Sequence, residues 1–142
     1  MTIVQSVGPN LLDDVASLLT PTFGPQMIWC DWLPPEPDIA IGIFQEPGKA
    51  PMRSQETLAA PVAQPELQVL VRGAPDAAQD ARLMAQGILE SLGAITNTPI
   101  GANFYLGFVP MHEPYLLGRD QLNRPMYAVT FSVMSRRLVA PF

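Results

Sequence analysis

The sequence contains few side chains that could act as an acid, a base, a nucleophile or a metal ligand. Its one histidine, His112, is followed by Glu113, a pair that could serve as a general base and the residue orienting it. Adjacent side chains on an extended segment point to opposite faces, and no serine or cysteine nucleophile motif accompanies this pair. We therefore assign His112 a structural or surface role.

The single cysteine, Cys30, lies in the apolar stretch MIWCDW, which predicts a buried and unreactive thiol with a raised pKa. It cannot form a disulfide within the chain, which is compatible with a reducing compartment. One histidine and one distant cysteine do not match a zinc-binding spacing, and no glycine-rich phosphate loop is present. We expect no metal, no cofactor and no nucleotide.

Trp29 and Trp32 could form a binding platform, although packing in the core is the preferred interpretation. A pocket near these rings and His112 is one alternative hypothesis, in which the protein is a small-molecule-binding domain or a hydrolase. Loss of an assayed turnover in His112→Ala without loss of fold would support that hypothesis.

Several arginines gather around one short turn and at the end of one expected strand. In LLGRDQLNRPMYAVTFSVMSRR the piece from Asp120 to Arg124 is polar and turn-like, and Pro125 begins the strand. These arginines are either solvated or form contacts in which guanidinium groups meet carboxylates of another subunit. The candidate subunit or tube contacts are Lys49, Arg53, Arg119, Asp120, Arg124, Arg136 and Arg137.

The composition argues against electrostatic binding of nucleic acid and favours a protein partner. The 142 residues carry a net charge of −5, so the clustered basic residues of such binders are missing. Hydrophobic residues make up 48% and charged residues only 15%, which suggests that some apolar surface meets a partner. The N-terminal stretch lacks the pattern of a signal peptide, and the uncharged run 91–112 is interrupted by Asn and Pro, so no transmembrane helix is expected.

Hydrophobic periodicity predicts two helices. Leu11 to Leu19 have helical spacing, with Asn10 as N-cap, acidic residues in the first turn and Pro21 as the end. The second helix, 75–93, has a capping box from Asp76 to Gln79, and its apolar face consists of Ala77, Ala81, Met84, Ala85, Ile88 and Leu92.

Period-two alternation predicts the strands. Ile39, Ile41 and Ile43 share one face, as do Leu67, Val69 and Val71, and further strands are expected at 102–111 and 126–135, with a short one at 27–31. The proline-rich stretch 45–65 is unusually long for a connection, so we expect a functional or disordered loop. The fold class is α+β: a single domain, 1–142, with a mainly antiparallel sheet of about four to five strands. Two main helices pack on one face, and a long loop, 45–66, protrudes.

The order of these pieces resembles a known family. PDIAIGIF, a proline-rich loop, ELQVLVRG, the acidic alanine-rich helix PDAAQDARLMAQGILESLG and finally YLLGRDQLNRPMYAVTFSVMSRR follow one another. In this order they look like the bacteriophage minor capsid family that includes the tail terminator proteins of long-tailed, siphovirus-type phages. The resemblance spans roughly Leu33 to Arg137 and is less clear over the first 32 residues.

The resemblance implies a non-enzymatic virion protein that caps the finished tail tube as a ring, a homohexamer, and offers a head–tail joining surface. Its implied partners are further copies of itself, the major tail tube protein and a head-completion or neck protein. It would be assembled in the host cytoplasm and lie at the head–tail junction. A head-completion or neck connector protein is the alternative within this class.

The acidic balance suits such a ring, because a negative channel wall repels DNA that passes without sequence-specific binding. Candidates for such a wall are Asp13, Asp14, Glu36, Asp38, Asp76, Asp80 and Glu90.

Overall fold

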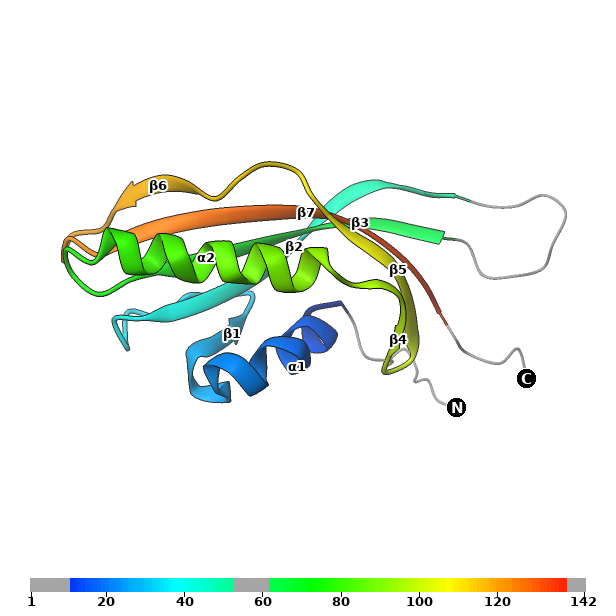
Figure 1. Cartoon of the computed structure of the whole chain (residues 1–142), viewed down its shortest axis with the longest axis horizontal. Helices are drawn as coiled ribbons and strands as arrows, with labels where there is room; N and C mark the ends of the chain where they lie inside the picture. The colour runs from blue at the N-terminus through cyan, green and yellow to red at the C-terminus, as the bar shows by residue number, and fades with distance from the viewer. Residues whose placement is uncertain (1–10, 53–61, 138–142) are drawn as a thin grey trace, which may run out of the picture.

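The computed structural model describes residues 11–52 and 62–137, which form two α-helices, one 3-10 turn and a curled sheet (Figure 1). The helices and the turn are α1 (Leu11–Phe23), η2 (Pro25–Met27) and α2 (Ala78–Gly93). The strands are β1 (Ile28–Cys30), β2 (Ala40–Met52), β3 (Val62–Arg72), β4 (Thr96–Ile100), β5 (Asn103–Pro110), β6 (Tyr115–Arg119) and β7 (Pro125–Arg137).

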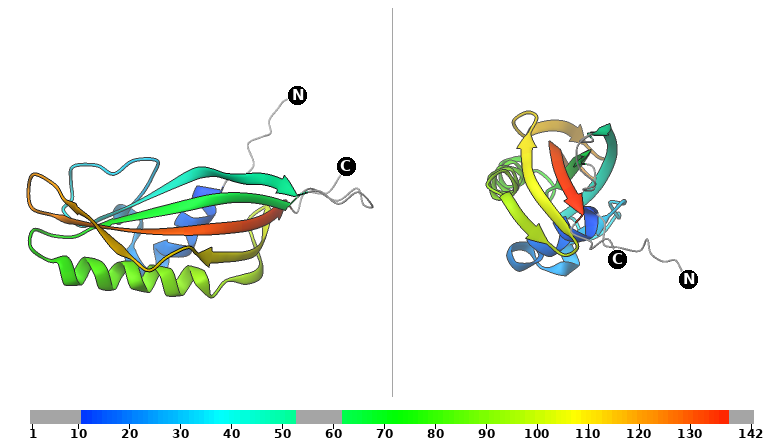
Figure 2. Two further views of the ribbon diagram at one scale, coloured as in Figure 1. Left: turned by 90° about the horizontal axis from the view of Figure 1, so that it is seen from above. Right: turned by 90° about the vertical axis from the view of Figure 1, so that its right-hand side faces the viewer.

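The sheet has the strand order β1-β2-β3-β7-β5-β4, and β6 pairs with β7 beyond the end of β5. Only the β1–β2 pair is parallel, and the other pairs among the described residues are antiparallel. Seen end-on, the sheet curls around the helices (Figure 2). The α+β class is confirmed, but the described sheet has seven strands where four to five were expected.

The two strands that the sequence analysis missed, β4 and β6, lie at the margin of the sheet and are largely exposed. Thr96–Ile100 contains two threonines, an asparagine and a proline, so it has no apolar alternation. Tyr115–Arg119 has three consecutive apolar residues instead of an alternating pattern. The periodicity rule detects strands that bury one face, and these strands do not.

The alternation on the long central strands is confirmed by burial. Ile41 and Ile43 on β2 are fully buried, as are the aliphatic residues Leu67, Val69 and Val71 on β3. Ile39, expected on the same face, lies before the start of β2 and is 38% exposed. The core is completed by apolar residues of both helices and of β5 and β7.

The helices follow their predicted faces but differ at their ends. In α2 the expected apolar face is buried at Ala81, Ala85, Ile88 and Leu92. The capping box was wrong, because the N-cap is Ala77 without a side-chain cap and Asp76 has a φ of 62°. The Asp76 side chain instead accepts a hydrogen bond from the Asn123 amide.

Helix α1 continues through Pro21 to Phe23, so Pro21 does not end it. A proline lacks only its own N–H, and close to the C-terminal end the helix loses one backbone hydrogen bond without being interrupted. The expected N-cap, Asn10, lies outside the described residues.

Most of the stretch predicted as the loop 45–66 is paired strand. Strand β2 pairs with β3 along its whole length, from Ala40 opposite Arg72 to Met52 opposite Val62, with irregularities on either side of Lys49. We call the paired segments 46–52 and 62–66 the arm; they extend past the helices in Figure 2. Gly48 has a φ of 66°, and a Cβ there would collide with the Gln64 carbonyl oxygen. Strand pairing thus continues through a proline-rich sequence because its bulges accommodate residues that a regular ladder excludes.

Candidate assembly surfaces

The arginine-rich turn between β6 and β7 is held together by Asp120. Its Oδ1 accepts hydrogen bonds from the backbone N–H groups of Leu122, at 2.9 Å, and Arg124, at 3.0 Å. Its Oδ2 accepts a hydrogen bond from Nε of Arg124 at 2.7 Å. The Arg124 backbone N–H is the main cause that lowers the pKa of the Asp120 carboxyl, and the Arg124 guanidinium acts in the same direction. The predicted turn before β7 is therefore confirmed, with Asp120 as its organiser.

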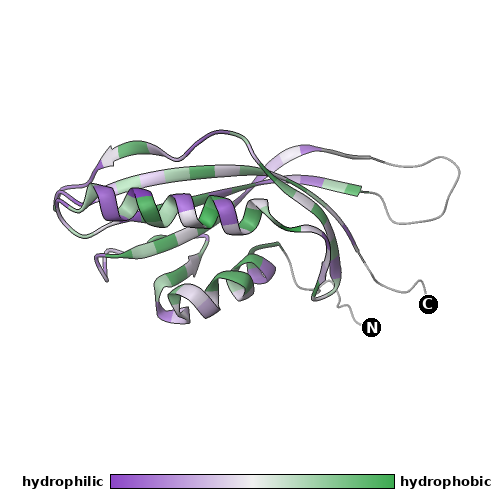
Figure 3. Cartoon of the chain, viewed as in Figure 1, coloured by the Kyte–Doolittle hydropathy of each residue, from purple (hydrophilic) through white to green (hydrophobic). Residues whose placement is uncertain are grey.

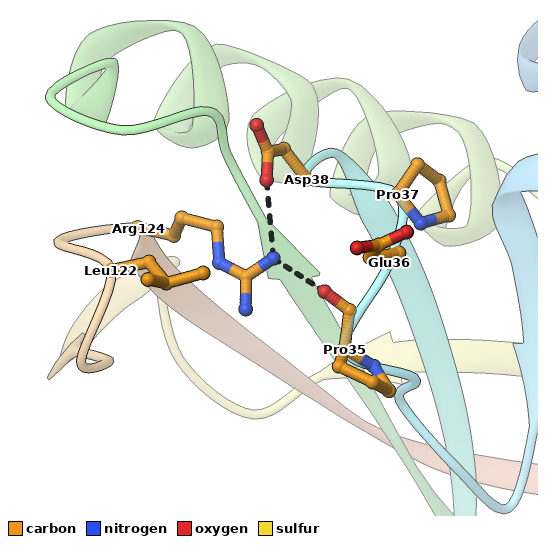
Figure 4. A pocket seen from close by; sticks show the side chains of 6 residues that line it. All are labelled: Pro35, Glu36, Pro37, Asp38, Leu122 and Arg124. Atoms are coloured by element: carbon orange, nitrogen blue, oxygen red, sulfur yellow. Dashed lines mark hydrogen bonds and ion pairs between the residues drawn. The ribbon is translucent and has the colours of Figure 1, made fainter.

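Arg124 connects this turn to the segment that precedes β2. Its side chain is 6% exposed, and Nη1 donates to the Pro35 carbonyl oxygen at 2.6 Å and to Oδ1 of Asp38 at 3.2 Å (Figure 4). The structure thus places this candidate interface residue inside the subunit. The physical reason is that its planar fork satisfies partners on two segments of the same chain.

Arg72, at the end of β3, holds the same segment. It is buried, its Nε donates to the Asp38 carbonyl oxygen at 2.9 Å, and its Nη2 donates to the Pro37 carbonyl oxygen at 2.6 Å. Burial lowers the pKa of Arg72, and the neighbouring Arg124 charge lowers it further. We call Arg72 and Arg124 together the arginine clamp, because both bind backbone carbonyl groups of 35–38. The sequence analysis overlooked Arg72, whose position at the end of a buried strand was the available signal.

A pocket of about 390 Å³ opens beside the clamp. Figure 4 shows its lining side chains, which come from the segment before β2 and from the β6–β7 turn: Pro35, Glu36, Pro37, Asp38, Leu122 and Arg124. The carboxylates of Glu36 and Asp38 thus lie beside the buried guanidinium of Arg124. We call this the clamp pocket.

The other predicted contact residues lie at several places. Lys49 is exposed in the arm and Arg119 is exposed at the end of β6. Arg136 is exposed near the end of β7, with its guanidinium carbon 5.8 Å from the Phe104 ring centroid. Arg137 ends β7, and Arg53 lies outside the described residues. Their role as subunit contacts stays a prediction.

The sequence analysis missed an exposed apolar surface around β6, which we call the β6 strip: Val109, Met111, Tyr115, Leu116 and Leu117. Tyr115, Leu116 and Leu117 are consecutive in a strand and each is 44–47% exposed, so apolar groups lie on both of its faces. Figure 3 shows this hydrophobic character on β6. Among the described residues, β6 pairs only with β7, which leaves its second edge open. Such an edge is a ready template for association.

The residues of the alternative small-molecule hypothesis are not assembled into one site. Trp29 lies on the edge strand β1, whereas His112 follows β5, and β2, β3 and β7 lie between those strands in the sheet. The His112 ring packs edge-on against Tyr115, and its Nδ1 lies 2.8 Å from the Glu113 carbonyl oxygen. Trp32 is 53% exposed, contrary to the expectation of core packing. The clamp pocket contains none of these three residues.

Cys30 is exposed at the end of β1, and not buried as its apolar neighbours predicted. Partial burial still raises the pKa of its thiol, and nearby Asp13 and Asp31 add to this effect. In residues 11–52 and 62–137 no group of His, Cys, Asp or Glu side chains could hold a metal ion. Within the same residues, no helix is long and apolar enough to cross a membrane.

Fold and surface together define a small α+β protein in which two buried arginines, Arg72 and Arg124, hold the segment 35–38 and the open edge of β6 is apolar. A family described as bacteriophage tail terminator protein matches residues 14–134, and the chain belongs to this family. A solved chain from the virion of a native gene transfer agent particle has a similar fold, with a TM-score of 0.55 and 16% sequence identity. The alignment covers 96% of this chain and 98% of that one. No curated protein matches the sequence.

Proposed function

We propose that this chain ends tail growth by closing as a ring on the completed tail tube. The observation that carries this proposal is the family match over residues 14–134. The β6 strip supports it, because a subunit that functions alone has no need of an apolar edge strand exposed on both faces.

A closed ring needs a head-to-tail interface between two different surfaces of each subunit. The β6 strip and the arm are two such surfaces, and they belong to different strands of the sheet. The ring is expected to be a hexamer, as the resemblance to tail terminators implies. Its lower face would contact the major tail tube protein and its upper face a head-completion or neck protein.

The charge of the chain fits passage of DNA through such a ring. Asp13, Asp76, Asp80 and Glu90 are exposed, so their carboxylates could repel phosphate from a channel wall. The other two exposed candidates, Glu36 and Asp38, line the clamp pocket instead. Asp14 is buried and is removed from the candidates for this wall. The protein would act in the virion at the head–tail junction, without catalysis, after assembly in the host cytoplasm.

The position in the particle can be tested by cryo-electron microscopy of virions that carry this chain with a bulky C-terminal tag. The proposal expects additional density as a ring at the head-proximal end of the tail tube. Tag density only within the head or at the tail tip would contradict it. Tag density above a separate capping ring would favour the neck-protein alternative.

A further inference from the structure

The clamp pocket has the features of a receptor for a basic side chain. The Glu36 carboxylate is exposed, and the Asp38 side chain is 52% exposed although Oδ1 contacts Arg124. Among the described residues, Glu36 forms no ion pair and Asp38 forms one only with Arg124. The rim is formed by proline rings and by Leu122, which is 59% exposed and suited to packing against an aliphatic stem.

A hydrogen-bond donor lies within the same pocket. The Arg124 side chain is more than nine-tenths buried, with Nε bound to Asp120 and Nη1 bound to Pro35 and Asp38. Its Nη2 makes no hydrogen bond to the residues that the structure describes. A donor in this position fits the backbone carbonyl oxygen of an incoming peptide segment. The pocket therefore matches a cationic side chain together with the peptide that carries it.

The chain contains one lysine, Lys49, and it is located in the arm. Lys49 is exposed and forms no ion pair among the described residues. Of the other described cations, Arg72 and Arg124 are engaged in the clamp and Arg136 packs over Phe104. Arg82 and Arg119 are exposed too, but they belong to α2 and β6 and not to the arm. The arm and the β6–β7 turn that lines the pocket lie at opposite ends of the long axis of the molecule (Figure 1). An arm can therefore contact such a pocket only in another copy of the chain, and the two copies would be arranged head to tail.

We propose that the clamp pocket of one subunit receives Lys49 from the arm of the next copy in the ring, where Glu36 and Asp38 bind its ammonium group. Charge complementarity and the opposed positions of arm and pocket carry this inference, which rests on the proposed ring. Arg124 then has two roles, since it builds the pocket wall and offers Nη2 to the incoming backbone.

Zero-length carbodiimide cross-linking of assembled particles tests the proposal, because it joins only an amine and a carboxylate that are in contact. Particles assembled from a mixture of isotopically light and heavy chains are expected to give a mixed-isotope peptide that joins Lys49 to Glu36 or Asp38. Lys49→Arg should remove the cross-link and retain assembly, since the charge remains. A cross-link from Lys49 to a tail tube protein, or none to Glu36 or Asp38, would overturn the proposal.

A charge exchange provides the second test. Glu36→Lys and Lys49→Glu should each reduce ring formation by about tenfold, as expected for a broken interfacial pair, and the double variant should restore most of it. Gln79→Lys, at an exposed position of α2, is the matched control and should assemble normally. Failure of the double variant to recover would count against the pairing. Normal tail lengths in these variants, together with overlong tails when the protein is absent, would refute the pocket and leave the terminator function intact.

Discussion

A hydrogen bond from the Tyr105 hydroxyl to Oδ2 of Asp14 joins α1 to β5 in the interior of the protein. The amide of Asn103 donates to the same oxygen at 2.9 Å, and Asp14 is 4% exposed. Burial raises the pKa of the Tyr105 hydroxyl, and the neighbouring Asp14 raises it further, so this group stays a donor. The contact fixes the first helix on the sheet across 91 residues of sequence.

Loss of this buried contact should destabilise the fold. Tyr105→Phe removes one of the two side-chain donors to the buried Asp14 carboxylate, so the free energy of unfolding should fall by about 1–3 kcal/mol. Asp14→Ala should cost at least as much, because two donors lose their acceptor. Chemical denaturation measures both values, with exposed Gln79→Ala as the control. A Tyr105→Phe variant as stable as the parent would contradict the assignment.

The arginine clamp should depend on the shape of the guanidinium as well as on its charge. Arg72→Lys keeps the charge but cannot reach the carbonyl groups of Pro37 and Asp38 with the same fork, so we expect a loss of about 2–4 kcal/mol. Arg119→Lys, at an exposed strand end, should change stability by less than about 0.5 kcal/mol. Equal effects of the two substitutions in thermal or chemical unfolding would argue against the clamp.

The pH dependence of stability should report Asp120. Its pKa in the folded protein lies below the ordinary value of 3.8, so the unfolded chain binds a proton more readily than the folded one. The stabilisation from Asp120 is therefore present above about pH 4 and is lost as the pH falls through the folded-state pKa. Asp120→Asn should be less stable than the parent at pH 7. This difference in the free energy of unfolding should disappear once the pH is below the folded-state pKa of Asp120. A difference that is independent of pH would rule out this origin.

Gly48 should control the arm. An alanine there would have to adopt a positive φ and displace the Gln64 carbonyl group, so pairing of 46–52 with 62–66 should be lost. Hydrogen exchange should show faster exchange of the arm amides, with little change in the central strands. Gly87→Ala is the control, because its Cβ would meet no atom within 4 Å and alanine favours helix. Unchanged protection of the arm in Gly48→Ala would contradict this account.

The β6 strip should be needed for assembly and not for folding. Leu116→Asp with Leu117→Asp places two charges on an edge that association would bury, so ring formation should fall sharply. Stability of the isolated subunit should change by about 1 kcal/mol or less, since both side chains are exposed. Leu83→Asp is the control, because Leu83 is also an exposed leucine but lies on α2. Sedimentation of the assembled material measures the effect, and normal assembly of the double variant would exclude the strip as an interface.

The elements that bury one face were predictable from sequence. Ile41 and Ile43, and likewise the buried residues of α2, follow a period that burial itself imposes. The arm was not predictable, because its prolines normally exclude regular pairing and its bulges depend on a glycine in a rare conformation.

The candidate site was less predictable than the fold. Arg124 carries the same sequence signal as the exposed Arg119, and only the tertiary arrangement of 35–38 decides that one is buried and the other is not. The sequence did carry a signal for the β6 strip. Three consecutive apolar residues at 115–117 place apolar groups on both faces of a strand, and such a strand cannot bury both faces in a one-sided core.

The most direct test of the central claim is the distribution of tail lengths in particles produced without this protein. Electron microscopy of lysates should show tails that exceed the normal length by widely varying amounts, beside filled heads without tails. A plasmid copy of the gene should restore one narrow length. Tails of normal length that fail to join heads would assign the chain to the neck, and normal infectious particles would contradict a role in the virion.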